Sequence, residues 1–396
     1  MTIEASRSAQ ISRRLRLGMV GGGQGAFIGA VHRIAARLDD RYELVAGALA
    51  SQADRAHASA RELHIAPQRS YDDFHVMAKA EAARADGIDV VSVVTPNHLH
   101  YPVAKVFLDA GIHVLCDKPL TSTLEDARSL VRQVERSGLL FGLTHNYTGY
   151  PLVRMAREMV AAGELGELRV IQAEYPQDWL STRLEDSGQK QASWRVDPAQ
   201  AGAGGSLGDI GTHAFNLTSF ISGLELVQLC ADTQTFVPGR RLDDNAHVLL
   251  RYSGGARGML WTSQVAPGNE NGLLVRIYGS KGGLEFRQEH PNQLRFTPLG
   301  KAPQLLTRGG PGNSSVAAGH ATRIPSGHPE GYLEAFAQLY RDFAEQVTAR
   351  LEHREPDALA CLVPTVHDGA RGVKFIAAAV ESSLADGRWV DATVRF

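Results

Sequence analysis

A run of nearly all β-branched residues, Val90-Val91-Ser92-Val93-Val94, is the feature that most constrains the fold of this 396-residue chain. Such side chains favour extended backbone, and a strand without polar alternation must be covered on both faces. Parallel sheets flanked by helices meet this condition. The surrounding sequence repeats the order strand, turn, helix, so we predict an α/β domain with a doubly wound parallel sheet of the Rossmann type over residues 14–147. Its other strands are expected at 15–20, 42–49, 113–116 and 139–144.

The pattern changes after residue 147. Several segments now alternate apolar and polar residues, which is typical of an antiparallel sheet with one face towards solvent. We therefore predict a C-terminal α+β domain over residues 148–396, with a large, mostly antiparallel open sheet. Its strands are expected near 168–175, 225–236, 246–252, 258–264 and 274–278. Helices are expected at 152–162, 330–350 and 368–385, and a loop rich in Gly, Pro and Ser at 300–327.

Composition excludes several classes of function. The formal net charge of −2 provides no basic surface for nucleic acid. The three cysteines are isolated, so we expect neither a metal site nor a disulfide framework. No run approaches the roughly 18 apolar residues of a membrane span. Ser12-Arg13-Arg14 hints at an export signal, but the required apolar stretch and cleavage site do not follow, and we expect a cytoplasmic protein.

A glycine-rich turn follows the first predicted strand and precedes the first predicted helix. It fits the pattern G-x-G-x-x-A, in which glycine allows a tight turn and lets a pyrophosphate approach the backbone. The helix N-terminus beyond it offers unpaired N–H groups. The turn therefore predicts a dinucleotide site. Contacts are expected from Gly21, Gly23, Gln24, Gly25, Ala26, Phe27 and Ile28.

The choice between NAD(H) and NADP(H) stays open. An acidic residue at the end of the second strand usually binds the ribose hydroxyls, but residues 48–52 contain none. Ser51 and Arg55 could instead receive a 2′-phosphate, although Arg55 is equally well explained as a solvated helix residue.

Two polar segments lie where parallel strands end. Thr95-Pro96-Asn97-His98-Leu99-His100 follows the β-branched run, and Asp117-Lys118-Pro119 follows the next strand. Ligands of open parallel sheets bind at this edge. The residue before a proline is driven towards extended backbone, which directs Lys118 away from the sheet. A solvated lysine is the ordinary alternative.

A later segment combines two ionisable residues. Asp209 and His213 are four residues apart where a glycine-rich loop enters a predicted helix, so they share one helix face. Histidine titrates near neutral pH and suits proton transfer. A buried histidine satisfied by backbone, and a capping aspartate, are the alternatives that spacing alone leaves open.

Together these segments resemble the Gfo/Idh/MocA family (glucose–fructose oxidoreductase, inositol dehydrogenase and rhizopine-catabolism proteins) from about residue 16 to about residue 390. Members have a glycine turn followed by T-P-N-x-x-H, E-K-P and D-x-G-x-H segments. Three features depart from that pattern. The turn is about three residues longer before His32, Asp117 replaces the common Glu, and the acid after the second strand is missing.

The resemblance implies a nicotinamide-dependent oxidoreductase acting on a secondary hydroxyl of a sugar, sugar derivative or inositol. His213 would be the general base in oxidation. Lys118 would stabilise charge on the substrate oxygen and keep the histidine neutral. Asp209 would position substrate hydroxyls or the histidine. Further cofactor contacts are expected from Thr95, Pro96, Asn97, His100, Asp117, Lys118, Asn146, Trp194 and Arg195. Substrate contacts are expected from Lys118, Tyr147, Gln177, Asp178, Asp209, His213 and His328.

Two other functions remain open at this stage. Some relatives oxidise a sugar transiently and eliminate its glycosidic substituent, which requires a tyrosine base such as Tyr147 or Tyr175. Others keep the cofactor fold as a non-catalytic sensor, which the presence of Lys118, Asp209 and His213 argues against. The family also forms assemblies, and we expect a homodimer or homotetramer through the C-terminal sheet.

Overall fold

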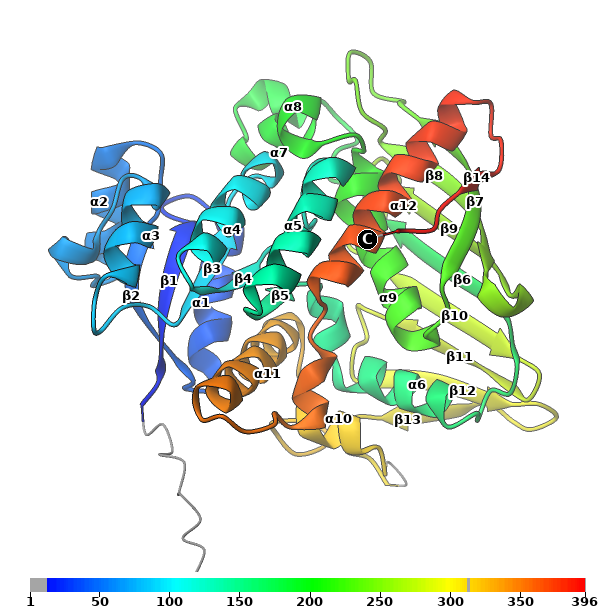
Figure 1. Ribbon diagram of the computed structural model, residues 1–396. Coiled ribbons are helices and arrows are strands. Elements are labelled where there is room, and N and C mark those ends of the chain that lie inside the picture. Colours follow the sequence, from blue (N-terminus) through cyan, green and yellow to red (C-terminus); the bar gives the residue numbers. More distant parts are fainter. Residues whose placement is uncertain (1–12, 312–313, 396) are drawn as a thin grey trace, which may run out of the picture.

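The computed structural model describes residues 13–311 and 314–395. Two β-sheets and the helices that cover them make up these residues (Figure 1). The first sheet has the strand order β2-β1-β3-β4-β5, and all its pairings are parallel. Its strands are β1 (Leu15–Gly21), β2 (Tyr42–Ala48), β3 (Val90–Val94), β4 (His113–Cys116) and β5 (Phe141–Leu143). The doubly wound parallel sheet is thus confirmed.

Helices cover both faces of this sheet, as the β-branched run requires. All five side chains of β3 are buried. Helix α1 packs on one face together with α11, whereas α3, α4, α5 and α12 pack on the other. The N-terminal helices are α1 (Phe27–Leu38), α2 (Ala53–Glu62), α3 (Phe74–Ala82), α4 (His100–Asp109) and α5 (Leu124–Ser137).

The second sheet has nine strands in the order β13-β12-β11-β10-β6-β9-β8-β7-β14. Only the β6–β9 pairing is parallel among its pairings, so the expectation of a mostly antiparallel sheet is confirmed. Its strands are β6 (Leu168–Pro176), β7 (Leu226–Gln234), β8 (Asn245–Tyr252), β9 (Arg257–Ser263), β10 (Leu274–Gly279), β11 (Gly282–Arg287), β12 (Gln293–Pro298), β13 (Gln304–Thr307) and β14 (Val390–Asp391).

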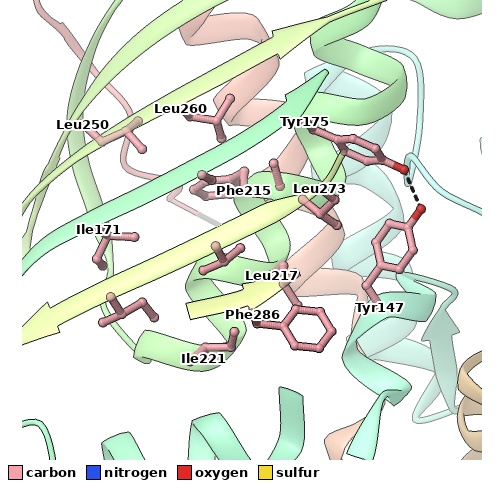
Figure 2. Packing of buried hydrophobic residues seen from close by; sticks show 14 of the residues in the cluster. Tyr147, Ile171, Tyr175, Phe215, Leu217, Ile221, Leu250, Leu260, Leu273 and Phe286 are labelled. Carbon is pink, nitrogen blue, oxygen red and sulfur yellow. Dashed lines mark hydrogen bonds between the residues drawn. The ribbon is translucent and has the colours of Figure 1, made fainter. Parts of the chain in front are cut away.

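One face of the large sheet packs against helices and forms the main core. Figure 2 shows Phe215, Leu217 and Ile221 of α9 facing apolar side chains of the strands. The opposite face presents large apolar side chains to solvent, among them Leu249, which is 50 % exposed, and Met259, which is 46 % exposed. The remaining helices are α6 (Pro151–Ala161), α7 (Lys190–Arg195), α8 (Pro198–Ala201), α9 (Thr212–Ser222), α10 (Val316–Ala321), α11 (Tyr332–Leu351) and α12 (Val366–Leu384).

The last two long helices return to the first sheet, although they follow the second sheet in sequence (Figure 1). Tyr340 of α11 is buried beneath the Rossmann sheet, where its hydroxyl lies 2.8 Å from both His32 Nδ1 and Ser92 Oγ. Asp342 forms an ion pair with Arg154 of α6 at 2.6 Å, and both side chains are fully buried. The first sheet is therefore linked through α11 to the second domain.

The expected loop over 300–327 is wrong in part. It contains strand β13 and helix α10. Strands β11 and β12 were not anticipated, because the first opens on two glycines and both carry charged residues that blur the alternation. Within the described residues, none of the helices has the length and apolar content that crossing a bilayer requires.

Candidate active site

A cavity of about 430 Å³ lies at the carboxyl ends of the parallel strands, between the first sheet and the second domain. Its volume is in the range of pockets that bind small molecules. Residues that follow β3, β4 and β5 of the first sheet line the cavity. Residues from β6, α7, α9 and the ends of the β10–β11 hairpin in the second domain also line it. The crevice expected at this sheet edge is therefore present.

Lys118 projects from the end of β4 into this cavity and is fixed by the second domain. Its Nζ donates to the backbone oxygen of Asp209 at 2.5 Å and to Oδ1 of the same residue at 2.9 Å. The side chain is 13 % exposed. An ammonium has three N–H groups, and these two bonds leave one for a ligand in the cavity.

The carboxylate of Asp209 is occupied by protein donors. Besides Lys118, it accepts from Arg195 Nε at 3.2 Å and from Gln264 Nε2 at 2.9 Å. Burial alone would raise the pKa of this carboxyl, but the charges of Arg195 and Lys118 hold the pKa well below its ordinary value. Asp209 is thus ionised and its oxygens are largely used, which suits it to holding two cations better than to binding substrate hydroxyls.

The backbone around Asp209 forms a π-helical turn. Residues 207–211 adopt this wider turn directly before α9 begins. Such turns are rare and frequent at functional sites. Asp209 and His213 both line the cavity, as their spacing predicted. Within the described part of the chain, no side-chain hydrogen bond joins these two residues.

His213 of α9 is buried and lines the same cavity. Its ring lies 4.7 Å from the ring of Tyr147 and 5.5 Å from that of His145, measured between centroids. Burial, and then the charges of Lys118 and His145, lower the pKa of His213 well below its ordinary value. Its Nδ1 has no hydrogen-bond partner among the described residues. The imidazole of His213 is therefore neutral, and it lines the cavity.

Asp117 lies beneath Lys118 and is also ionised. Its Oδ1 accepts from the hydroxyl of Thr144 and from the backbone N–H of Lys118, both at 2.9 Å. Burial would raise the pKa of the carboxyl, but His32, whose Nε2 lies 3.7 Å from Oδ1, and the charge of Lys118 hold the pKa well below its ordinary value. The shorter aspartate still reaches the cavity.

The glycine turn has the geometry of a phosphate cradle. Gly21 and Gly22 adopt positive φ angles of 80° and 70°. A Cβ on Gly29 would lie 2.3 Å from the backbone oxygen of Gly22, so α1 packs on the turn through a bare glycine. Gly29 therefore provides the close packing of helix on turn that the third small residue of such a pattern serves.

A second cavity, of about 510 Å³, opens beside the turn. Gly23, Gln24, Gly25 and Ala26 line it. Phe27, which is 66 % exposed, lines both this cavity and the larger crevice. Phe27, the first residue of α1, is thus shared by the two cavities.

The residues considered for the adenosine ribose lie at the surface. Ser51 and Arg55 are exposed, and Arg55 Nη2 donates to the backbone oxygen of Gln24 at 3.3 Å. Arg55 thus lies against the glycine turn. Both side chains remain candidates for a 2′-phosphate.

Of the other residues predicted to contact cofactor or substrate, some line the cavity and others lie outside its lining. His100 is buried, and its ring nitrogens face the backbone oxygens of Pro119 at 2.6 Å and of Thr95 at 3.0 Å. It therefore connects the segments that follow β4 and β3. Asp178 accepts from the backbone of Gly268, and its side chain does not line the cavity. Pro96 and His328 also lie outside the lining. Those that line it are Ile28, Thr95, Asn97, Asn146, Tyr147, Gln177, Trp194 and Arg195.

Several lining residues were missed in the sequence. Asn271 precedes β10 and Gln288 follows β11, and both reach the cavity beside the end of β6. In an antiparallel sheet these positions share an edge, so a correct assignment of the β10–β11 hairpin would have indicated them. The others are Thr144, Gln191, Ile210, Tyr332 and Phe336.

Two family models match the chain. One, described as "Oxidoreductase family, NAD-binding Rossmann fold", matches residues 15–145. The other, described as "GFO/IDH/MocA C-terminal domain", matches residues 153–285. Together they include most of the residues that line the cavity.

Individual proteins are similar over nearly the whole chain. The "Uncharacterized oxidoreductase YfiI" of Bacillus subtilis is 36 % identical, covering 96 % of this chain and 98 % of its own. The crystal structure of an oxidoreductase from Sinorhizobium meliloti is 55 % identical with a TM-score of 0.86, covering 96 % of this chain and 99 % of its own.

A third similar protein has been crystallised with ligands. An inositol dehydrogenase homolog from Azotobacter vinelandii, complexed with NAD+, is 40 % identical with a TM-score of 0.91, covering 96 % of this chain and 98 % of its own. The crystal structure of an inositol dehydrogenase homolog from Azotobacter vinelandii complexed with NADH and myo-inositol is 38 % identical with a TM-score of 0.88, covering 96 % of this chain and 98 % of its own.

Proposed function

Because this chain belongs to the Gfo/Idh/MocA family of NAD(P)-dependent oxidoreductases, we propose that it transfers a hydride between a nicotinamide dinucleotide and a secondary hydroxyl of a sugar, sugar derivative or inositol. One observation carries the proposal. The ammonium of Lys118 and the neutral imidazole of His213 line one cavity from opposite domains, next to the glycine turn.

The residues around the turn fit a dinucleotide. The backbone of Gly21 to Phe27 and the N-terminus of α1 would hold the pyrophosphate. A Cβ at position 23 would lie 2.6 Å from the backbone oxygen of Leu49, so this part of the cradle requires glycine. When bound, the nicotinamide supplies the hydride acceptor or donor.

The proton of the alcohol goes to His213 in the direction of oxidation. A neutral imidazole can accept this proton, and proton transfer by a positioned side chain accelerates such reactions by typically 10²–10⁴-fold. The remaining N–H of Lys118 hydrogen-bonds the same oxygen and stabilises the developing negative charge. Asp209 holds the ammonium in place through its backbone and side-chain oxygens. Reduction uses the same groups in reverse.

The first experiment identifies the nucleotide. The purified protein is denatured and the released material is separated and compared with NAD(H) and NADP(H). A panel of inositols, aldoses and glycosides is then screened by nicotinamide absorbance. We expect turnover of at least one cyclic polyol or sugar. Absence of both bound nucleotide and nucleotide affinity would contradict the proposal.

The second experiment separates binding from chemistry. His213→Ala and Lys118→Ala should each bind the dinucleotide as the unmodified protein does, while turnover falls by on the order of 10²-fold or more. Unchanged turnover in either variant would remove that residue from the mechanism.

The tyrosine-dependent glycosidase is less well supported. It would need an ionised phenol at Tyr147 or Tyr175. Burial raises the pKa of both hydroxyls, that of Tyr175 well above its ordinary value. A histidine that is already neutral suits direct hydride transfer better.

We also propose that the exposed face of the large sheet forms a homodimer or homotetramer. Its apolar side chains lie on neighbouring strands, at Val170 (39 % exposed), Leu249, Met259 and Tyr278 (42 % exposed). An apolar patch of this kind marks an interaction surface. Light scattering should give two or four times the chain mass, and Leu249→Lys/Met259→Lys should give the monomer.

A further inference from the structure

Uncharged side chains joined by hydrogen bonds line the cavity at the end of β6 and continue behind its lining. Trp179 Nε1 donates to Gln177 Oε1 at 3.0 Å, and Gln177 Nε2 donates to Asn271 Oδ1 at 2.8 Å. The hydroxyl of Tyr175 also reaches Asn271 Oδ1, at 2.8 Å. Tyr147 and Tyr175 are joined through their hydroxyls (Figure 2).

The amide chain continues away from the tyrosine pair. Asn271 Nδ2 donates to Gln288 Oε1 at 2.8 Å, and Gln288 Nε2 donates to the hydroxyl of Tyr150 at 3.0 Å. Every amide in the network therefore has both ends engaged. A change in the orientation of one amide forces its neighbours to turn as well.

Trp179 determines which group donates and which accepts in every hydrogen bond of this network. We call this order the direction of the network. The indole N–H of Trp179 can only donate, whereas amides and hydroxyls can face either way. Gln177 must therefore present its oxygen to Trp179 and its NH₂ group to Asn271. Asn271 must in turn present its oxygen to Gln177.

The direction at the tyrosine pair follows from this. Tyr175 faces the oxygen of Asn271, so its single proton is donated there. The oxygen of Tyr175 then accepts from Tyr147, whose own proton is used. The phenol oxygen of Tyr147 is left with only acceptor capacity towards the cavity.

Burial makes this direction costly to reverse. Tyr147 is 4 % exposed and Tyr175 is 2 % exposed. Turning Asn271 alone would place its NH₂ group against that of Gln177, and both of these side chains are partly buried. An unpaired buried polar group costs about 1–3 kcal/mol.

We propose that Trp179, Gln177 and Asn271 are specificity-determining residues that make Tyr147 a hydrogen-bond acceptor for a donating hydroxyl of the ligand. The ring of Tyr147 lies 4.7 Å from that of His213, so the hydroxyl it selects neighbours the reacting carbon. The ligand class is a vicinal polyol, whose second hydroxyl is free to donate. This assignment of the ligand rests on the proposed function.

Gln177→Glu and Asn271→Asp each add one negative charge, but only the first should reverse the donor and acceptor roles in the network. In Gln177→Glu the carboxylate cannot donate, so Asn271 turns its NH₂ group towards it. Tyr175 then accepts from Asn271 and donates to Tyr147, whose proton turns into the cavity. In Asn271→Asp the carboxylate still accepts from Tyr175 and Gln177, so Tyr147 remains an acceptor. Both are measured at about pH 8, where a carboxyl is ionised.

Neutron diffraction of deuterated crystals of the nucleotide-bound protein tests the direction without any turnover. In the unmodified protein and in Asn271→Asp, we expect the deuteron of Tyr147 to point at Tyr175. In Gln177→Glu it should point into the cavity. A deuteron of Tyr147 pointing into the cavity of the unmodified protein would overturn the proposal, whether or not a substrate has been found.

Turnover tests the selectivity. The probes are myo-inositol and its monodeoxy-monofluoro analogues, with NAD+ as the cofactor, because fluorine accepts but cannot donate. The unmodified protein and Asn271→Asp should disfavour the analogue fluorinated next to the reacting carbon by about tenfold or more in kcat/KM. In Gln177→Glu, the ratio of kcat/KM for myo-inositol to kcat/KM for this analogue should fall towards one. An equal ratio in both variants would overturn the proposal while leaving hydride transfer intact. Failure of all polyols would instead contradict the proposed function, and the neutron result would still decide the direction.

Discussion

The side chains of Lys118 and His213 influence each other's chemistry across the cavity. Burial lowers the pKa of His213, and the ammonium of Lys118 lowers it further. Because the neutral form is the one that accepts a proton, kcat/KM for oxidation should stay level as the pH falls to about 6.5, the ordinary histidine value. The acid limb should appear only below it. Stopped-flow or steady-state rates between about pH 5 and pH 9 measure this profile.

The Lys118→Met variant is the control for that profile. Without the ammonium, the pKa of His213 should rise towards the value set by burial alone. The residual activity should therefore lose rate at a higher pH than the unmodified protein does. An acid limb at the same pH in both would show that Lys118 does not act on His213.

The carboxylate of Asp209 accepts hydrogen bonds from Lys118, Arg195 and Gln264. An amide in its place would lose the charge that holds two cations. We expect Asp209→Asn to lower kcat/KM on the order of 100-fold, about 2.7 kcal/mol, with little change in dinucleotide affinity. Gln264→Leu removes one neutral donor and should cost less than about tenfold. Equal losses in both would contradict a special role for the charge.

At the scale of elements, the junction of the glycine turn with α1 depends on a missing side chain. The Cβ of Gly29→Ala would lie 2.3 Å from a backbone oxygen of Gly22, which cannot move aside without reshaping the cradle. We expect weaker dinucleotide binding, by on the order of tenfold or more, and a lower midpoint of thermal unfolding. Gly319→Ala in α10 meets nothing within 4 Å and is the matched control. That variant should keep affinity and gain up to about 1 kcal/mol of stability.

Sequence patterns predicted well those strands in which every side chain is buried. Val90–Val94 could only be a covered strand, and the residues after it therefore had to lie at the ligand edge. The patterns did not predict the π-helical turn at residues 207–211, where the backbone oxygen of Asp209 accepts from Lys118 of the other domain. Asn271 and Gln288 could not be found either, since a polar residue beside a short strand resembles any turn residue until the hairpin is aligned.

At the scale of the whole molecule, one buried ion pair joins α6 of the second domain to α11 beneath the first sheet. Arg154 and Asp342 are 2.6 Å apart, and neither side chain is exposed. Removing the cation alone leaves a buried carboxylate. Arg154→Met should therefore reduce the free energy of unfolding by about 3–5 kcal/mol. The double variant Arg154→Met/Asp342→Leu should recover much of this loss in urea titrations, and a double variant as unstable as the single one would contradict the explanation.

Buried histidines make the stability of the whole molecule depend on pH. Burial lowers the pKa of His113 to about 4 and that of His145 to about 3, with further lowering from the charges of Arg350 and Lys118 respectively. In the unfolded chain each histidine binds a proton below about pH 6.5. The folded state does not bind it until its own lower pKa is reached. Stability is therefore complete above about pH 6.5 and is lost as the pH falls towards 4.

His113→Asn tests the contribution of one such group. Leu140 donates its backbone N–H to His113 Nδ1 at 3.0 Å, and the amide oxygen of asparagine can accept the same bond without titrating. Between about pH 6 and pH 4.5, the free energy of unfolding should fall less steeply in this variant, by about 1.4 kcal/mol per pH unit. Denaturant titrations at several pH values measure both slopes. Because one protonation event fewer is coupled to unfolding, the difference must vanish above about pH 7. Parallel slopes at acid pH would mean that His113 is already protonated in the folded protein.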